Sequence, residues 1–185
     1  MLLSALLIGA AWAADGEVVQ TLKVDLNGDG KSESIVLKRL GEQSRLVVLD
    51  SQGRTLWEAP RSELFLFGGP LDGGDLQAAG DLDGDKRIDL VGTYQKSDVS
   101  PTRFRWFRWT GSELELVSQG YLCPLNQRPG TFKLSESQGS PYWVERVLAI
   151  EPGRMKVELF DSVTDERNQT VWLRTDRNGE FVITQ

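Results

Sequence analysis

The chain contains no histidine and only one cysteine among its 185 residues. The absence of histidine excludes Ser-His-Asp triads, histidine general bases and most zinc or iron sites. A single cysteine excludes a disulfide within the chain. Basic residues are in the minority, with 21 Lys and Arg against 27 Asp and Glu, so the net charge is −6. We therefore expect no nucleic acid and no anionic lipid as a general partner, because both repel an acidic chain.

Long apolar runs are also scarce, and the one that stands out is at the N-terminus. Residues 1–11 are apolar and small, and Ala11-Trp12-Ala13 fits the small-x-small rule for signal cleavage. The run is too short to anchor the chain across a bilayer. It predicts a signal peptide over residues 1–13, a single β-rich domain over 14–185, and a periplasmic or secreted location. The alternative interpretation is a buried apolar strand or helix.

The single cysteine, Cys123, lies in Tyr121-Leu122-Cys123-Pro124, far from the signal. Its position excludes a lipid-attachment role. An intermolecular disulfide or a reactive thiol is one interpretation. The interpretation we favour is a small buried hydrophobe beside a turn.

Local signals along the chain predict β-structure. Residues 18–24 and 34–37 are rich in β-branched side chains and flank an acidic loop. Three further stretches, 45–57, 103–117 and 170–184, each predict two strands joined by a turn. In the last of these the turn holds Asn178-Gly179, a strong hairpin signal. No long amphipathic helix is evident; the best candidate, Ser34–Leu40, is short.

Two acidic loops share one spacing, 56 positions apart: Asp25-Leu26-Asn27-Gly28-Asp29-Gly30-Lys31-Ser32-Glu33 and Asp81-Leu82-Asp83-Gly84-Asp85-Lys86-Arg87-Ile88-Asp89. Both carry an oxygen-bearing side chain at positions 1, 3, 5 and 9. This spacing lets a short loop wrap one hard cation, usually calcium, in carboxylate and carbonyl oxygens. The predicted side-chain ligands are Asp25, Asn27, Asp29 and Glu33, and Asp81, Asp83, Asp85 and Asp89. We expect up to two calcium ions.

The loops are not EF-hands, because the twelfth position is Val36 in one and Gly92 in the other, where an EF-hand has a bidentate Glu. The ninth residue must close the coordination instead. The seventh, Lys31 or Arg87, would contribute its backbone carbonyl and leave its side chain to point away.

The sixth position of each loop requires a sharp turn. Gly30 suits that turn in the first loop. Lys86 holds the same position in the second loop, where a strained backbone would cost about 1 kcal/mol.

Each loop lies between predicted strands and is followed by a hairpin, which indicates a repeat. The units run over residues 18–60 and 74–120, and residues 131–185 are predicted to form a degenerate third unit. A period near 50 residues is of the size that propeller blades use. Residues 123–130 are predicted to connect the second unit to the third.

Phe67-Gly68-Gly69-Pro70, the Gly80–Asp85 stretch and Asp89-Leu90-Val91-Gly92 resemble the FG-GAP repeat. That repeat and its VCBS relatives build the calcium-binding blades of integrin-α-like β-propellers. The resemblance spans roughly residues 18–120 and implies the same metal ligands in both units. It implies an all-β fold of antiparallel, propeller-like blades. A closed propeller needs at least four blades, so an incomplete or irregular propeller, or one completed by oligomerisation, is expected. A β-sandwich is the alternative.

Two other interpretations of the loops stay open. They are solvated acidic turns without metal, or dockerin-like paired loops, which are spaced more closely and followed by helices. If calcium is bound, its expected role is structural, because converging carboxylates repel one another without a cation.

Arg103-Phe104-Arg105-Trp106-Phe107-Arg108-Trp109 interleaves cations with aromatic rings, which suggests either a binding surface or an inner strand packed on both faces. We favour the inner strand, with Glu113 and Glu115 as partners of the arginines. Five tryptophans follow the predicted signal peptide, and most are expected to be core: Trp57, Trp106, Trp109, Trp143 and Trp172. A platform formed by some of them leaves a carbohydrate ligand open beside a protein ligand.

We expect an exported calcium-binding module with a binding or scaffold role in the cell envelope, and no enzymatic activity. The alternative is a small calcium-dependent hydrolase acting on polysaccharide or lipid.

Overall fold

The computed structural model describes residues 16–41, 43–60, 76–95, 101–124, 130–135, 142–161, 163–164 and 166–184. All regular elements in these ranges are β-strands, and all their pairings are antiparallel. The all-β, antiparallel prediction is therefore confirmed. The finer predictions, propeller blades or a β-sandwich, stay predictions.

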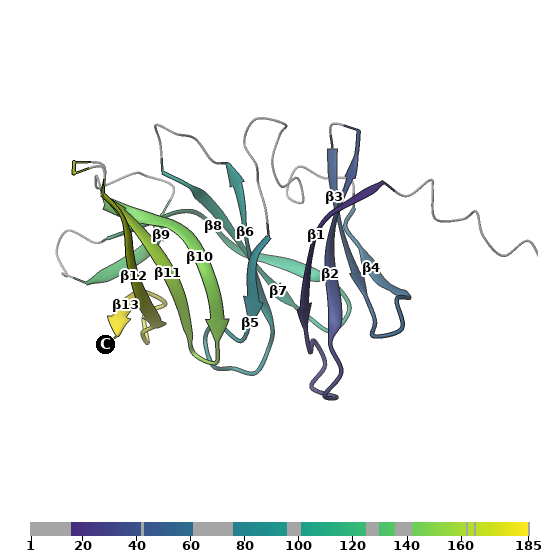
Figure 1. Ribbon diagram of the computed structural model, residues 1–185. Coiled ribbons are helices and arrows are strands. Elements are labelled where there is room, and N and C mark those ends of the chain that lie inside the picture. Colours follow the sequence, from purple (N-terminus) through teal and green to yellow (C-terminus); the bar gives the residue numbers. More distant parts are fainter. Residues whose placement is uncertain are drawn as a thin grey trace, which may run out of the picture.

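The first sheet is a four-stranded meander in which each strand pairs with the next (Figure 1). Its strands are β1 (Glu17–Val24), β2 (Glu33–Leu40), β3 (Gln43–Leu49) and β4 (Thr55–Glu58). Ser34–Leu40, the best candidate for a helix, is part of β2. Its β-branched residues Ile35 and Val36 are buried in a strand that pairs with a neighbour on each side, and this tertiary pairing overrides a weak helical signal.

The second sheet has nine strands in the order β10-β11-β12-β13-β9-β8-β7-β6-β5. They are β5 (Leu76–Gly80), β6 (Asp89–Gln95), β7 (Arg103–Trp109), β8 (Leu114–Pro124), β9 (Thr131–Ser135), β10 (Tyr142–Glu151), β11 (Arg154–Asp161), β12 (Glu166–Thr175) and β13 (Phe181–Thr184). The predicted hairpins β3–β4, β7–β8 and β12–β13 are all present. The structure thus joins the second predicted unit and the C-terminal strands in one sheet.

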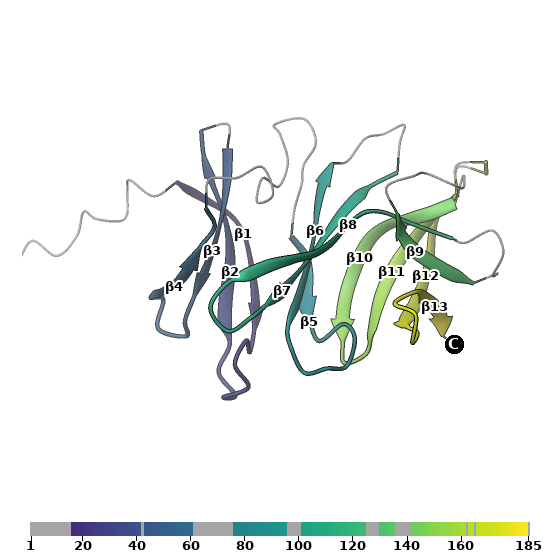
Figure 2. The same ribbon diagram turned by 180° about the vertical axis from the view of Figure 1, so that it is seen from behind.

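The nine-stranded sheet curls until its two edge strands, β5 and β10, meet, so that it forms a nearly closed barrel (Figures 1 and 2). The Val147 N–H on β10 donates to Oε1 of Gln77 on β5 at 3.2 Å. A Cβ added to Gly80 would lie 2.8 Å from the Ile150 carbonyl oxygen, so only glycine permits this approach. Just past the strands, the Gly153 N–H donates to the Asp81 carbonyl at 2.9 Å. The barrel is therefore closed between β5 and β10 by hydrogen bonds from a side chain and from a loop.

The first sheet packs beside the barrel, with β1 next to β5. A hydrophobic cluster joins the two sheets, drawing Ile35, Leu37, Leu46 and Val48 from the first and Leu76, Leu90, Phe107, Trp109 and Leu114 from the second. A separate cluster fills the barrel interior, with Val144, Val157, Leu159 and Leu173 among its members. The fold therefore has two main cores, one between the sheets and one inside the barrel.

Strand β7 contributes to both cores. Phe107 and Trp109 face the first sheet, whereas Phe104 and Trp106 face the barrel interior. This confirms that the Arg-aromatic segment is an inner strand packed on both faces.

Cys123 is buried in a third, smaller cluster with Trp143 and Phe160, as a small hydrophobe would be. The predicted signal peptide, the Phe67–Pro70 motif and most of the 123–130 connection lie outside the described residues.

Candidate metal centre

The first acidic loop, residues 25–33, joins β1 to β2 and turns around the carboxylate of Asp25. The Gly28 N–H donates to Asp25 Oδ1 at 2.7 Å, and the Gly30 N–H donates to Oδ2 at 2.8 Å. Both glycines have a positive φ, 76° and 81°, which other residues adopt only at a cost. Backbone and side chain together fix the carboxylate at position 1.

The second acidic loop, residues 81–89, joins β5 to β6 and repeats this arrangement. Asp81 accepts from the Gly84 N–H at 2.7 Å and from the Lys86 N–H at 3.0 Å. Lys86 has a φ of 70° and is the only non-glycine residue with a positive φ in the described part of the chain. The strained backbone predicted at this position is therefore confirmed.

The side chains at positions 3 and 5 are also held in the same way in both loops. Each accepts a hydrogen bond from the backbone N–H two residues further on. The bonds are Asn27 Oδ1 with the Asp29 N–H (2.9 Å), Asp29 Oδ1 with the Lys31 N–H (2.8 Å), Asp83 Oδ1 with the Asp85 N–H (3.2 Å), and Asp85 Oδ1 with the Arg87 N–H (2.8 Å). The two loops thus share one conformation, and both lie at the same end of the molecule (Figures 1 and 2).

The ninth residue of each loop is buried. Glu33 Oε2 accepts from the Leu26 N–H at 2.8 Å, and Asp89 Oδ2 accepts from the Leu82 N–H at 3.1 Å. Relative exposure is 2% for Glu33 and 0% for Asp89. These two carboxylates therefore tie the end of each loop to its beginning.

Carboxylate oxygens of Asp81, Asp83 and Asp85 lie within 4.8 Å of one another, close enough to hold a metal ion together. Asp89 is not in this group. In the first loop the amide of Asn27 takes the place of one carboxylate. Both donor sets consist of oxygen alone, which suits a hard divalent cation better than zinc or copper.

Arg108 on β7 is part of the second site, which the sequence did not predict. Its Nε donates to Asp89 Oδ1 at 2.8 Å, and its Nη2 lies 2.5 Å from Asp83 Oδ2. Its Nη1 lies 3.5 Å from Asp85 Oδ2. Sequence reasoning proposed Glu113 and Glu115 as partners of the arginines, but Arg108 pairs with three aspartates of the loop. The feature that identifies Arg108 as part of the site is the β6–β7 strand register, in which Arg108 lies opposite Asp89.

The seventh residues differ from the expectation in one respect. Arg87 was predicted to point away from the site, but its Nε donates to Asp85 Oδ2 at 2.7 Å. The Arg87 side chain remains mostly exposed while doing so. It therefore neutralises part of the charge from the solvent-exposed side of the loop.

The pKa values follow these contacts. Hydrogen bonds from the loop backbone, that of Gly30 foremost, lower the pKa of Asp25. Burial raises the pKa of Asp89, and the Arg108 guanidinium opposes that rise. Burial also acts to raise the pKa of Asp85, but bonds from Arg87 outweigh it and the net change is downward. The Asp89 bond raises the pKa of Arg108, so the guanidinium stays charged.

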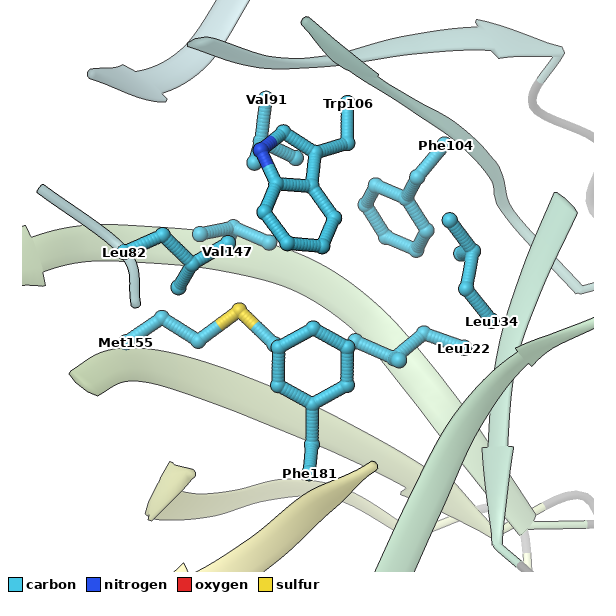
Figure 3. A pocket seen from close by; sticks show the side chains of 9 residues that line it. All are labelled: Leu82, Val91, Phe104, Trp106, Leu122, Leu134, Val147, Met155 and Phe181. Carbon is cyan, nitrogen blue, oxygen red and sulfur yellow. The ribbon is translucent and has the colours of Figure 1, made fainter. Parts of the chain in front are cut away.

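The barrel interior holds a cavity of about 20 Å³, and Leu82 of the second loop is one of the side chains around it (Figure 3). It is lined only by apolar atoms, from Leu82, Val91, Phe104, Trp106, Leu122, Leu134, Val147, Met155 and Phe181. The Trp106 N–H makes no hydrogen bond of normal geometry, although it is close enough to the Asp89 carboxylate to lower its pKa. Ligand pockets usually measure about 300–1,000 Å³. The interior is therefore a packed core.

Comparison with protein-family models, with curated proteins and with solved structures finds no match to this chain. The described residues include no helix that is long and apolar enough to cross a membrane.

Proposed function

We propose that the protein is an exported calcium-binding β-module in which the metal has a structural role and which serves as a binding or scaffold component of the cell envelope. The observation that carries the proposal is the shared conformation of the two acidic loops, 56 residues apart in the sequence. Equivalent backbone N–H groups hold equivalent oxygens at positions 1, 3 and 5 in both. Unrelated solvated turns have no reason to share these bonds.

The first loop supports the proposal most directly. Among the described residues, no Lys or Arg side chain pairs with the carboxylates of Asp25, Asp29 or Glu33, so their charge is balanced only by backbone N–H groups. Asp25, Asn27, Asp29 and Glu33 would supply side-chain oxygens, and Lys31 its carbonyl. Bound calcium would neutralise the carboxylates and fix the junction between β1 and β2.

We also propose that the chain is built from blade-like units. Strands β1–β4 and β5–β8 are both consecutive antiparallel meanders with an acidic loop in the first hairpin. Strands β10–β13 form a third meander in which the short turn Glu151–Arg154 replaces the loop. An experimental structure with calcium bound tests this architecture. Two sheets packed face to face as a sandwich would overturn it.

Calcium titration of the purified chain, by calorimetry and by thermal unfolding, tests the calcium proposal. We expect calcium to raise the melting temperature relative to chelator, and Asp29→Ala to abolish most of that rise. Asp161→Ala is the matched control, because Asp161 also accepts a backbone N–H group in an exposed turn, from Val163, and lies outside both loops. It should change stability equally with and without calcium. If calcium and chelator give the same melting temperature for the unmodified chain, the proposal is wrong.

A scaffold or binding role predicts that the protein binds a partner molecule and does not convert a substrate. Trp172 on β12 is half-buried, and the Arg154 guanidinium carbon lies 4.1 Å from its ring centroid, so a cation already covers this ring. Binding to a panel of glycans and envelope proteins, with and without calcium, would identify the class of partner.

A further inference from the structure

Arg108 lies where a cation would neutralise the second loop. It contacts three of the loop's four carboxylates, those of Asp83, Asp85 and Asp89. Its side chain is only 15% exposed, so these pairs are partly shielded from water. Charge-assisted bonds in such a setting are stronger than exposed ion pairs.

The strand framework fixes Arg108 in this place. Arg108 lies opposite Asp89 in the β6–β7 pairing, and the neighbouring Trp109 N–H donates to the Ile88 carbonyl at 2.8 Å. The Trp106 ring, on the same face of β7, lies 5.6 Å from the Arg108 guanidinium carbon. The guanidinium is thus placed by the sheet and by an aromatic neighbour, and it reaches the loop from a strand outside it.

The first loop has no arginine at the equivalent place. The β2–β3 register ends with Ser34 opposite Leu49, and the residue after Leu49 is Asp50, whereas the β6–β7 register includes Asp89 opposite Arg108. Asp50 is held in its own turn by Arg54, whose Nε donates to Asp50 Oδ2 at 2.6 Å. The two loops match in backbone conformation, but among the described residues an arginine from a neighbouring strand, Arg108, contacts the carboxylates of the second loop only.

We propose that Arg108 is the internal cation of the second loop, so that the chain binds one calcium ion tightly, in the first loop, and keeps the second loop ordered without metal. This inference rests on the proposed calcium binding and specifies which of the two loops takes the ion. An opposite charge within about 4–6 Å of a carboxylate changes its affinity for a proton about 10- to 1,000-fold. Arg108 should weaken competing calcium by at least about tenfold for the same reason.

Calorimetric calcium titration of the purified, calcium-free chain tests the proposal, with Arg108→Gln as the variant and Arg103→Gln as the matched control. Both variants remove one positive charge from β7. Only Arg108→Gln empties the space among Asp83, Asp85 and Asp89, because Arg103 lies over the Tyr121 ring, with 4.7 Å between its guanidinium carbon and the ring centroid. We expect one tight site in the unmodified chain and in Arg103→Gln, and two sites in Arg108→Gln. In chelator, Arg108→Gln should melt at a lower temperature, and calcium should restore it.

Two equally tight sites in the unmodified chain would overturn the role of Arg108 and leave the calcium-binding proposal intact. One site in Arg108→Gln would also overturn it. No calcium binding in any of the three proteins would overturn the calcium-binding proposal itself.

A second measurement covers the case in which Arg108→Gln does not fold. Asp29→Asn disables the first loop and leaves Arg108 in place. Its remaining calcium affinity should be at least about tenfold below that of the unmodified chain. An affinity equal to that of the unmodified chain would overturn the proposal.

Discussion

The side-chain amide of Gln20 hydrogen-bonds both backbone groups of Leu76: its Oε1 accepts from the Leu76 N–H at 2.8 Å, and its Nε2 donates to the Leu76 carbonyl. Gln20 lies on β1 and Leu76 begins β5, so one side chain links the first sheet to the barrel. On the other side of β5, Gln77 accepts from the Val147 N–H of β10. Strand β5 is thus tied to a neighbouring sheet edge on each side by a glutamine.

Replacing Gln20 with Leu should destabilise the fold by about 1–3 kcal/mol, because it leaves two backbone groups of the buried Leu76 without partners. Urea unfolding in chelator measures this change in the free energy of unfolding. Thr21→Ala, an exposed position on the same strand, is the control and should stay within about 0.5 kcal/mol. An equal effect of the two substitutions would contradict the role of Gln20.

Gly80→Ala should cost about 1–3 kcal/mol, since the new methyl group would meet the Ile150 backbone oxygen at 2.8 Å and force β5 and β10 apart. Removing the Ile150 side chain as well should not restore stability, because the backbone contact remains. Thermal unfolding of Gly80→Ala, Ile150→Ala and the double variant decides this. Full recovery in the double variant would place the clash on the side chain instead.

Lys86→Gly and Gly30→Ala should have opposite effects on stability. Lys86 adopts a φ of 70°, which costs about 1–2 kcal/mol for a residue with a Cβ, whereas Gly30 adopts 81° without that cost. Glycine loses about 0.5–1 kcal/mol through the flexibility of the unfolded chain. We therefore expect Lys86→Gly to stabilise by up to about 1 kcal/mol and Gly30→Ala to destabilise, both measured by urea unfolding in chelator. Destabilisation by both substitutions would show that the Lys86 side chain contributes more than its backbone costs.

Acid should remove stability that Asp25 provides at neutral pH. Its pKa in the folded chain lies below the ordinary value of 3.8, so the folded state binds a proton less readily than the unfolded state. The contribution is complete above the unfolded pKa and is lost as pH falls through the folded one. In chelator, Asp25→Asn should therefore lose less stability than the unmodified chain on acidification from about pH 5 to about pH 3. Equal losses would mean that the Asp25 carboxylate is not held by the loop backbone.

Sequence reasoning worked where the determining interactions are local. The acidic loops are set by glycines and by side chains that bond their own backbone two to five residues away, so spacing alone predicted the sharp turn at position six and even the strain at Lys86. The hairpins followed from β-branched strands bounded by turn residues. These features need no knowledge of the rest of the chain.

The sequence could not predict interactions that depend on register between distant strands. Arg108 reaches Asp89 only because β6 and β7 pair in one register, and its position 19 residues downstream gives no local sign of it. The bond from Gln20 to Leu76 spans 56 residues, and the closure of the barrel brings β5 to β10. Glu113 and Glu115 were predicted as partners of the arginines because the turn suggested the nearest acidic residues. Arg108 pairs instead with the denser group of aspartates in the second loop.

Because Cys123 is buried, its reactivity toward a thiol reagent reports local opening of the barrel. Cys123 is 4% exposed and packs with Trp143 and Phe160, where β8 and β10 approach each other. Because the sequence has no other cysteine, the rate at which a thiol reagent modifies the chain measures how often this part of the barrel separates from its neighbours. The opening kinetics of the barrel can therefore be followed in the unmodified protein, without an introduced label.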